Sequence, residues 1–141
     1  MEQKSLREKI DEHTWNQFST RLPKKEAVEV LRELFDYTVE NLSTRIDQIK
    51  VDDSKAISFF SDSREFLTLN ITRNNLRIYI HPAAGTFFEP KMSIRVEKFN
   101  FWKSSYHKTS GKYRGISVWI SEKMYLPEVK SLIDNIPKKM G

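Results

Sequence analysis

The apolar residues of this chain recur at two spacings, three to four residues apart near both ends and every second residue in between. In residues 24–42 the apolar positions fall on one side of a helix: Val28, Leu31, Phe35, Val39 and Leu42. The C-terminal stretch from Leu126 repeats the spacing at Val129, Leu132, Ile133 and Ile136. Both stretches are therefore predicted to form amphipathic helices, with Pro127 in the first turn of the second one and Pro137 as its stop.

A further helix is predicted over residues 5–22, where the apolar stripe is looser. Ser5 and Glu8 have the spacing of a capping box, in which a hydroxyl and a carboxylate satisfy free N–H groups of the first turn. Pro23 interrupts this helix and suits the first position of the next one. The residues after the second helix extend it or lead into a loop, with apolar positions at Ile46, Ile49 and Val51.

Between residues 55 and 121 the apolar spacing changes to two, which is typical of half-buried strands. Five strands are predicted, in residues 55–62, 65–72, 76–82, 92–101 and 115–121. The residues Arg73-Asn74-Asn75 tolerate a positive φ and predict a hairpin between the second and third of these strands. Because no crossover helix separates the strands, we expect one α+β domain over residues 1–141. Its predicted form is a two-layer sandwich, a mainly antiparallel five-stranded sheet with the N-terminal and C-terminal helices on one face.

The composition excludes several kinds of chemistry. The chain has 141 residues and no cysteine, which excludes disulfides, cysteine-ligated zinc and thiol catalysis. No N-terminal segment has the pattern of a signal peptide, and no apolar run approaches the roughly 20 residues that span a bilayer. We therefore expect a cytoplasmic protein without a membrane partner. The histidines His13, His81 and His107 lie far apart with no i,i+4 partner, so neither a metal site nor a cofactor is expected.

Charge is distributed unevenly along the chain. The formal net charge is +5, yet residues 1–90 total −2 and residues 115–141 total +1. Residues 91–114 total +6, with seven lysines and arginines against Glu97 alone. One short segment therefore carries more than the whole positive excess, and this asymmetry is the main functional signal in the sequence.

The C-terminal part of this segment is residues 98–114, which we name the basic-aromatic run because it interleaves cations with aromatic rings and contains no carboxylate. Such cations neutralise phosphates, and exposed rings stack on the bases of single strands. The candidate nucleic-acid-binding residues are Lys98, Trp102, Lys103, Tyr106, His107, Lys108, Lys112, Tyr113 and Arg114. We expect Phe99 and Phe101 to enter the core instead. Two alternatives stay open for the rest of the run: a hairpin with solvated lysines, or a surface for an acidic protein partner.

The chain also resembles a known family. The resemblance rests on VLRELFDYTVENL, KAISFF, EFLTLNI, LRIYIHP and GISVWISEKMYLPEVKSLIDNI, and extends over residues 28–136. These segments are similar to a small prokaryotic domain of unknown function that is sometimes labelled "predicted transport protein". That domain occurs alone or beside restriction-type nuclease domains. The resemblance implies the fold and a DNA-associated context, and it implies no catalytic residues. The family has a short, glycine-rich stretch before its fifth strand, where this chain has WKSSYHKTSGKYRG.

A nuclease is a further interpretation. Asp62 and Glu89-x-Lys91 imitate the acidic residues and lysine that hold a divalent metal in restriction-type enzymes. Pro90 argues against this, because proline removes a hydrogen-bond donor where such enzymes need a regular central strand. A metal-independent ribonuclease would instead use His107 for proton transfer and Arg114 to stabilise the developing charge.

The sequence thus favours a non-enzymatic module that binds DNA or RNA through the basic-aromatic run, largely without sequence specificity. The leading alternative is a small-ligand or protein-interaction domain. Its binding site would be an apolar groove between sheet and helices, lined by Trp15, Tyr37, Trp102 and Trp119. A small nuclease is the third interpretation.

Overall fold

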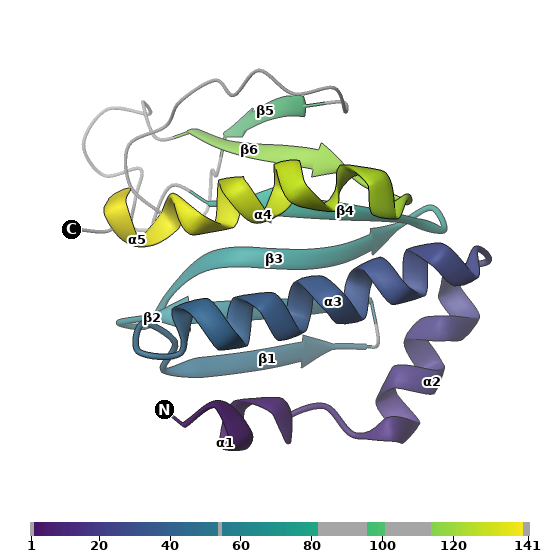
Figure 1. Ribbon diagram of the computed structural model, residues 1–141, viewed down its shortest axis with the longest axis horizontal. Coiled ribbons are helices and arrows are strands. Elements are labelled where there is room, and N and C mark those ends of the chain that lie inside the picture. The colour runs from purple at the N-terminus through teal and green to yellow at the C-terminus, as the bar shows by residue number, and fades with distance from the viewer. Residues whose placement is uncertain (1, 54, 82–95, 101–113, 140–141) are drawn as a thin grey trace.

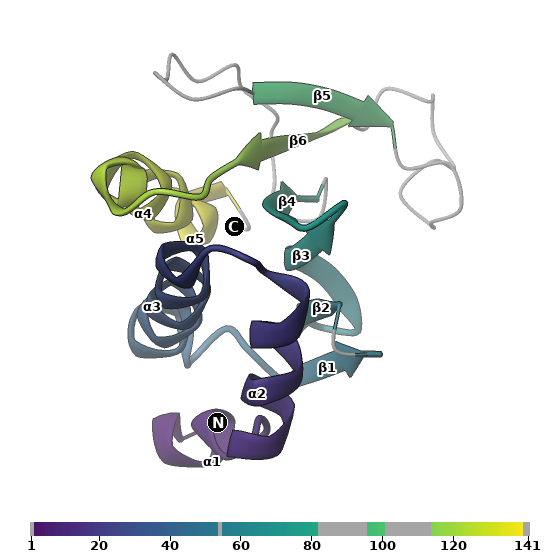
Figure 2. The same ribbon diagram turned by 90° about the vertical axis from the view of Figure 1, so that its right-hand side faces the viewer.

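The computed structural model describes residues 2–53, 55–81, 96–100 and 114–139. Its helices and strands form two layers, with the helices on one side of a single sheet (Figures 1 and 2). The strands are β1 (Gln48–Asp52), β2 (Ala56–Ser61), β3 (Arg64–Thr72), β4 (Asn75–Ile80), β5 (Val96–Asn100) and β6 (Arg114–Trp119). The helices are α1 (Gln3–Arg7), α2 (Glu12–Arg21), α3 (Lys25–Leu42), α4 (Leu126–Asp134) and α5 (Ile136–Lys139), with a 3₁₀ turn at Lys123–Tyr125. The predicted α+β sandwich with N-terminal and C-terminal helices is confirmed.

The sheet is antiparallel in all its described pairs and has the order β1-β2-β3-β4-β6-β5. The five predicted strands are present, and β1 adds a sixth at one edge. This strand occupies residues for which the sequence predicted either an extension of the helix or a loop. Ile46 and Ile49 fit a helical spacing, whereas Ile49 and Val51 fit a strand, and pairing of Ile49 with Phe59 of β2 decides for the strand.

The prediction of one helix over residues 5–22 is wrong in one respect. The structure has two helices there, α1 and α2. The second helix has its own N-cap, since the Asp11 carboxylate accepts a hydrogen bond of 2.8 Å from the backbone N–H of Thr14. The capping box at Ser5 and Glu8 does not form, because Ser5 lies inside α1. The break lets irregularly spaced apolar side chains all reach the core: Leu6, Ile10, Trp15 and Phe18.

The long helix α3 and the C-terminal helix lie side by side over the sheet (Figure 1). Pro23 precedes the N-cap of α3, Lys24, and so lies outside the first turn where it was predicted. Pro127 does lie in the first turn of α4. Pro137 was predicted to stop this helix, but α4 already ends at Asp134 and Pro137 belongs to the short α5.

The core fills the space between the two layers. Helix α3 contributes the side chains Ala27, Val30, Leu31, Leu34, Phe35, Thr38, Val39 and Leu42. An aromatic chain crosses the layers, from Trp15 to Phe35 at 5.4 Å between ring centroids, then to Phe59 at 5.8 Å and to Phe66 at 6.4 Å. Buried aromatic pairs of this kind add attraction beyond the area they bury.

A β-bulge changes the predicted alternation of β3. Phe59 pairs with Leu67, but the next residue, Phe60, pairs with Glu65, so Phe66 is an extra residue. Both Phe66 and Leu67 are fully buried as a result. The bulge therefore gives the core a second large side chain, and it brings Glu65 within hydrogen-bond distance of Thr68.

Two tight turns set the register of the central strands. Arg73 and Asn74 join β3 to β4 with φ values of 52° and 66°, which confirms the predicted hairpin. Asp62 and Ser63 join β2 to β3 in the same way, with φ values of 51° and 63°. Positive φ at both central residues is the geometry that suits the right-handed twist of a hairpin.

Candidate nucleic-acid interface and polar clusters

The structure describes the two ends of the basic-aromatic run. In the pairing of β5 with β6, Lys98 lies opposite Ile116, and Asn100 lies opposite Arg114. The two ends of the run therefore lie on neighbouring strands at the β5 edge of the sheet (Figure 2). The predicted binding residues between them lie outside the described residues: Trp102, Lys103, Tyr106, His107, Lys108, Lys112 and Tyr113. Phe101 lies outside them as well, so these predictions stay predictions.

The sheet face opposite α3 and α4, which we name the polar face, carries hydrogen-bonding side chains. Arg77 lies at its centre, with its guanidinium carbon 4.7 Å from the ring centroids of both Tyr79 and Trp119. Its Nη2 donates to Oε2 of Glu97 at 2.7 Å and to Oγ of Ser117 at 2.8 Å. One arginine thus joins β4, β6 and β5. Because Glu97 balances its charge, Arg77 does not act as a free cation for phosphate.

A second cluster lies where β3 and β4 meet. The Thr68 hydroxyl donates to Oε1 of Glu65 at 2.5 Å and lies 2.8 Å from Nε2 of His81. That imidazole nitrogen is 3.4 Å from the Glu65 carboxylate, and the His81 side chain is only 6% exposed. Burial raises the pKa of Glu65. The hydrogen bond and the charge of His81 lower this pKa, as do hydrogen bonds from Thr68 and Ser58. These contacts outweigh the effect of burial and bring the pKa to about 2.

The sequence had placed His81 only as a strand-end residue, which is correct, and it missed the contact with Glu65. The signal for the contact was the hairpin register. Once Arg73 and Asn74 form the turn, the strand residues pair so that Thr68 lies opposite Tyr79, and His81 follows two residues later. A hydrogen bond from the His81 N–H to the Phe66 carbonyl, 3.1 Å long, continues this register.

The remaining residues singled out in the sequence lie apart from one another. His13 is exposed on α2, as expected. Asp62 lies in the β2–β3 turn, where its N–H donates to the Asp47 carboxylate at 2.5 Å, while Glu89, Pro90 and Lys91 lie outside the described residues. Among the described residues no group of three or more His, Asp or Glu side chains is arranged to hold a metal ion.

Three of the four residues expected to line an apolar groove are described, and they do not converge. Trp15 is buried between α2 and α3, where its ring meets Phe35. The Tyr37 hydroxyl donates to Asp134 at 2.5 Å, joining α3 to α4. Trp119 lies on the opposite side of the sheet against Arg77. These three side chains therefore do not form one groove.

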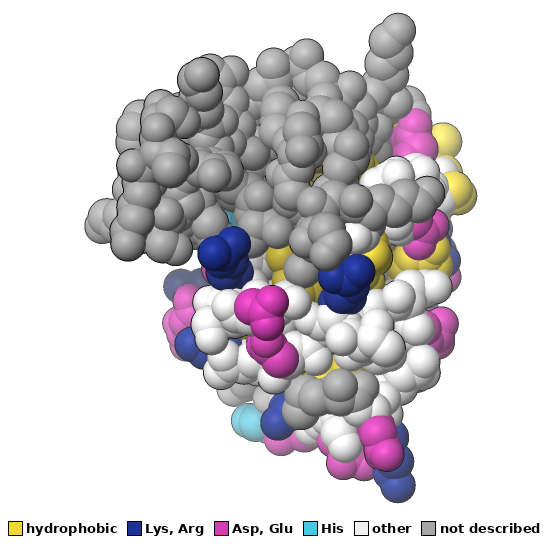
Figure 3. All heavy atoms as spheres, turned by 90° about the vertical axis from the view of Figure 1, so that its left-hand side faces the viewer, with side chains coloured by type: hydrophobic (Ala, Val, Ile, Leu, Met, Phe, Trp, Pro, Cys, Tyr) yellow, Lys and Arg dark blue, Asp and Glu magenta, His cyan; other side chains and the backbone are white. Residues whose placement is uncertain are grey.

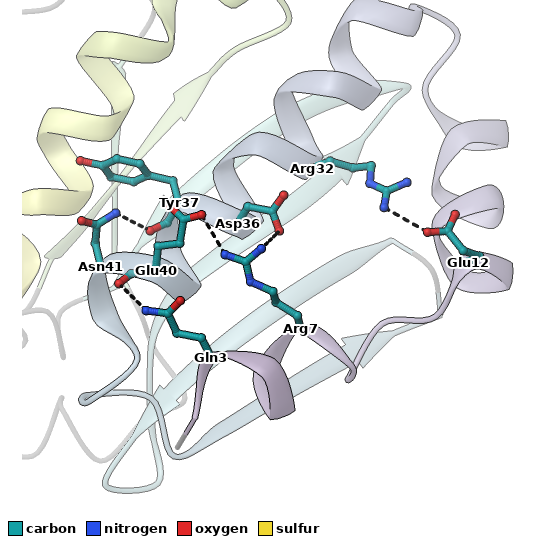
Figure 4. A network of polar contacts seen from close by, with 8 residues as sticks. All are labelled: Gln3, Arg7, Glu12, Arg32, Asp36, Tyr37, Glu40 and Asn41. Atoms are coloured by element: carbon teal, nitrogen blue, oxygen red, sulfur yellow. Dashed lines mark hydrogen bonds and ion pairs between the residues drawn. The ribbon is translucent and has the colours of Figure 1, made fainter.

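Charged side chains on the described surface are mostly mixed in sign. Figure 3 shows basic and acidic side chains interspersed over the described part of one end of the molecule. Several charges on the helical layer are paired, as in Figure 4: Arg7 donates to Glu40 at 2.8 Å, and Arg32 donates to Glu12 at 3.1 Å. These exposed pairs tie α1 and α2 to α3 and offer no excess charge to a ligand.

One hollow departs from this mixture. It lies at the end of the sheet where α2 ends, β2 begins and β3 turns into β4 (the end that faces the viewer in Figure 2). Its volume is about 440 Å³, and its polar lining consists of Arg21, Lys55, Asn70, Thr72, Arg73 and Asn74. The three cations come from distant parts of the sequence, so a search for runs of charge does not find them.

In comparisons with known proteins, no family model, curated protein or solved structure matches this chain. The resemblance to the small prokaryotic domain therefore stays a prediction. In the described part of the chain, no helix combines the length and apolar character needed to cross a bilayer.

Proposed function

We propose that this protein is a non-enzymatic, nucleic-acid-associated module that binds through the basic-aromatic run, largely without regard to base sequence. The supporting observation is the pairing of Asn100 with Arg114, which holds both ends of the run side by side at the β5 edge. Between these two positions the sequence contains Lys103, Lys108 and Lys112 and no carboxylate. A concentration of cations without acidic neighbours attracts phosphates through release of counterions.

The aromatic residues of the run give the proposal its second part. Trp102, Tyr106 and Tyr113 alternate with the lysines, and rings of this kind stack on unpaired bases whatever their identity. We therefore expect single strands to bind more tightly than duplexes of the same length. Because stacking and phosphate contacts carry little sequence information, we expect similar affinities for unrelated sequences.

The test is fluorescence anisotropy with labelled single-stranded DNA, duplex DNA and single-stranded RNA in low salt. The triple variant Lys103→Ala, Lys108→Ala, Lys112→Ala should weaken binding to all sequences and reduce the slope of log affinity against log salt by about 1 per lysine. The matched control removes three exposed lysines of the helical layer, Lys4→Ala, Lys9→Ala and Lys24→Ala, with the same change in net charge. Equal weakening by both triples, or no complex with any nucleic acid at low salt, would overturn the proposal.

The same samples test the other functions. Oligonucleotides incubated with the protein and Mg²⁺ should stay intact, and cleavage that His107→Ala or Glu89→Ala abolishes would replace the proposal by a nuclease. An acidic protein partner would also answer the charge of the run. In that case the unaltered protein would bind the acidic partner but no nucleic acid, and the triple variant would bind the partner more weakly.

A further inference from the structure

The hollow between α2 and the β3–β4 turn combines three cations. Arg21 comes from the last turn of α2, Lys55 from the residue before β2, and Arg73 from the turn between β3 and β4. No carboxylate is among the lining residues. Like charges repel one another in proximity, so three cations around one hollow indicate a site that an anion stabilises.

The pairing of these cations inside the protein is weak. Lys55 lies 3.7 Å from the Asp53 carboxylate, and both side chains are more than half exposed, so this contact is worth little. In the described part of the chain, the side chains of Arg21 and Arg73 have neither a hydrogen-bond acceptor nor an ion-pair partner. A cation near a helix C-terminus offsets the helix dipole, which gives Arg21 a second role but does not explain Lys55 and Arg73.

The backbone around the hollow is fixed by hydrogen bonds. The N–H of Lys55 donates to the Asp52 carbonyl at 2.8 Å, and the N–H of Ile71 donates to the Lys55 carbonyl at 2.7 Å. Two residues after Ile71, Arg73 and Asn74 form the tight turn described above. The cations therefore extend from a scaffold that is already in place before a ligand arrives.

Neutral donors complete the lining. The Asn70 amide donates to the Thr72 hydroxyl at 3.1 Å, which leaves the proton of that hydroxyl available for a further acceptor. The Asn74 amide adds two more N–H donors from the turn. Two guanidinium groups, one ammonium and several neutral donors form the set that recognises phosphate oxygens.

We propose that this hollow is a second, separate binding site, specific for a phosphate group. Its volume of about 440 Å³ holds a phosphate with an attached small group. The site is remote from the two described ends of the basic-aromatic run. The strand β4 leads from Asn75, beside the turn, to Ile80, which lies opposite Ile116, two residues from Arg114. Five residue steps along a strand span about 17 Å. The phosphate belongs to a small phosphorylated molecule or to a nucleic-acid backbone.

The test is an NMR titration of ¹⁵N-labelled protein with inorganic phosphate at constant ionic strength. Amide shifts confined to residues 21, 55 and 70–74 are expected. The double variant Arg21→Gln, Arg73→Gln should lose at least tenfold in phosphate affinity, whereas Lys9→Gln, Lys24→Gln, with the same change in net charge, should lose less than twofold. Lys55→Gln gives an independent check, and the NMR spectrum itself reports whether each variant is folded. Shifts scattered over all cationic surfaces, or equal losses in the double variant and its control, would overturn the proposal.

Two further titrations identify the source of the phosphate. The ligand is a small phosphorylated molecule if adenosine monophosphate shifts the amide signals of these residues. In that case neither adenosine nor a short single-stranded oligonucleotide should shift them. The same shifts from the oligonucleotide assign a phosphodiester backbone. Both titrations use the variant Lys103→Ala, Lys108→Ala, Lys112→Ala, which removes the lysines of the basic-aromatic run. Binding at the hollow is therefore measured separately from binding at the run.

Discussion

Glu65 is ionised although burial works against its charge. His81, Thr68 and Ser58 supply the hydrogen bonds and charge that outweigh this cost and bring the pKa of the carboxyl group to about 2. A carboxylate whose pKa is lower in the folded state stabilises that state above its ordinary pKa, 4.5, and loses this contribution as the pH falls to about 2. The cluster therefore links the stability of the β3–β4 pair to acid.

We predict that Glu65→Gln lowers the unfolding free energy by about 1 kcal/mol at pH 7, less than the full pKa shift implies because water reaches part of the carboxylate. The difference from the unaltered protein should shrink between pH 4.5 and 2, where Glu65 takes up its proton. Urea unfolding at a series of pH values measures it. The control Glu12→Gln removes an exposed pair with Arg32 and should cost less than about 1 kcal/mol. A pH-independent difference for Glu65→Gln would contradict the assignment.

Among the secondary-structure elements, the two hairpins of the β2–β3–β4 sheet depend on unusual backbone angles. Ser63, in the first turn, has a φ of 63° without being glycine. A side chain with a Cβ pays about 1 kcal/mol in this region of φ, and a β-branched one pays more. The turn therefore stores a small, removable strain.

Ser63→Gly is expected to raise the unfolding free energy by about 0.5 kcal/mol, since relief of the strain is partly offset by the greater freedom of glycine in the unfolded chain. Ser63→Val should lower it by about 1–2 kcal/mol. Thermal unfolding followed by circular dichroism measures both. The same Ser→Gly change at Ser131, an exposed position inside α4, should destabilise by about 0.5 kcal/mol. Equal signs at the two positions would show that the turn geometry is not responsible.

The elements that the sequence predicted are those with one dominant local signal. The apolar stripe of α3 is five positions long, and Arg73-Asn74 tolerates the positive φ that its turn needs, so both were found. In contrast, Ile46, Ile49 and Val51 fit two spacings, and only the pairing with β2 selects β1. The break between α1 and α2 likewise depends on tertiary packing, because it is set by which side chains reach the core.

The candidate sites divide in the same way. The basic-aromatic run is continuous in sequence, so composition alone marks it. Arg21, Lys55 and Arg73 are brought together only by the docking of α2 at the end of the sheet. The contact of Glu65 with His81 requires both the hairpin register and the bulge at Phe66. A sequence read one segment at a time does not reveal such combinations.

At the scale of the whole molecule, the sheet is assembled in two parts. Strands β1 to β4 follow one another through short turns, whereas β6 pairs with β4 across an interval of more than thirty residues in sequence. Closing a long chain segment costs entropy that short turns do not. We therefore expect β1–β4 to form in the folding transition state and β6 to join them later.

This expectation predicts different kinetics for two fully buried side chains. Leu69→Ala in β3 should mainly slow folding, with a φ-value above about 0.5, and Val118→Ala in β6 should mainly speed unfolding, with a φ-value below about 0.3. Stopped-flow folding and unfolding rates over a range of urea concentrations measure both values. Leucine-to-alanine changes in cores cost roughly 2–5 kcal/mol, which is large enough for reliable φ-values. The reverse order of the two values would show that β6 belongs to the folding nucleus.

The insertion of β6 between β4 and β5 also matters while the polypeptide is being synthesised. Until residues 114–119 have left the ribosome, the outer row of amide and carbonyl groups on β4 has no strand to join. A nascent or prematurely terminated chain thus exposes an unpaired strand edge, which can pair with strands of other molecules and cause aggregation. Cells that make this protein would need to shield β4 for the time it takes to add about forty more amino acids, which at typical translation speeds is a few seconds.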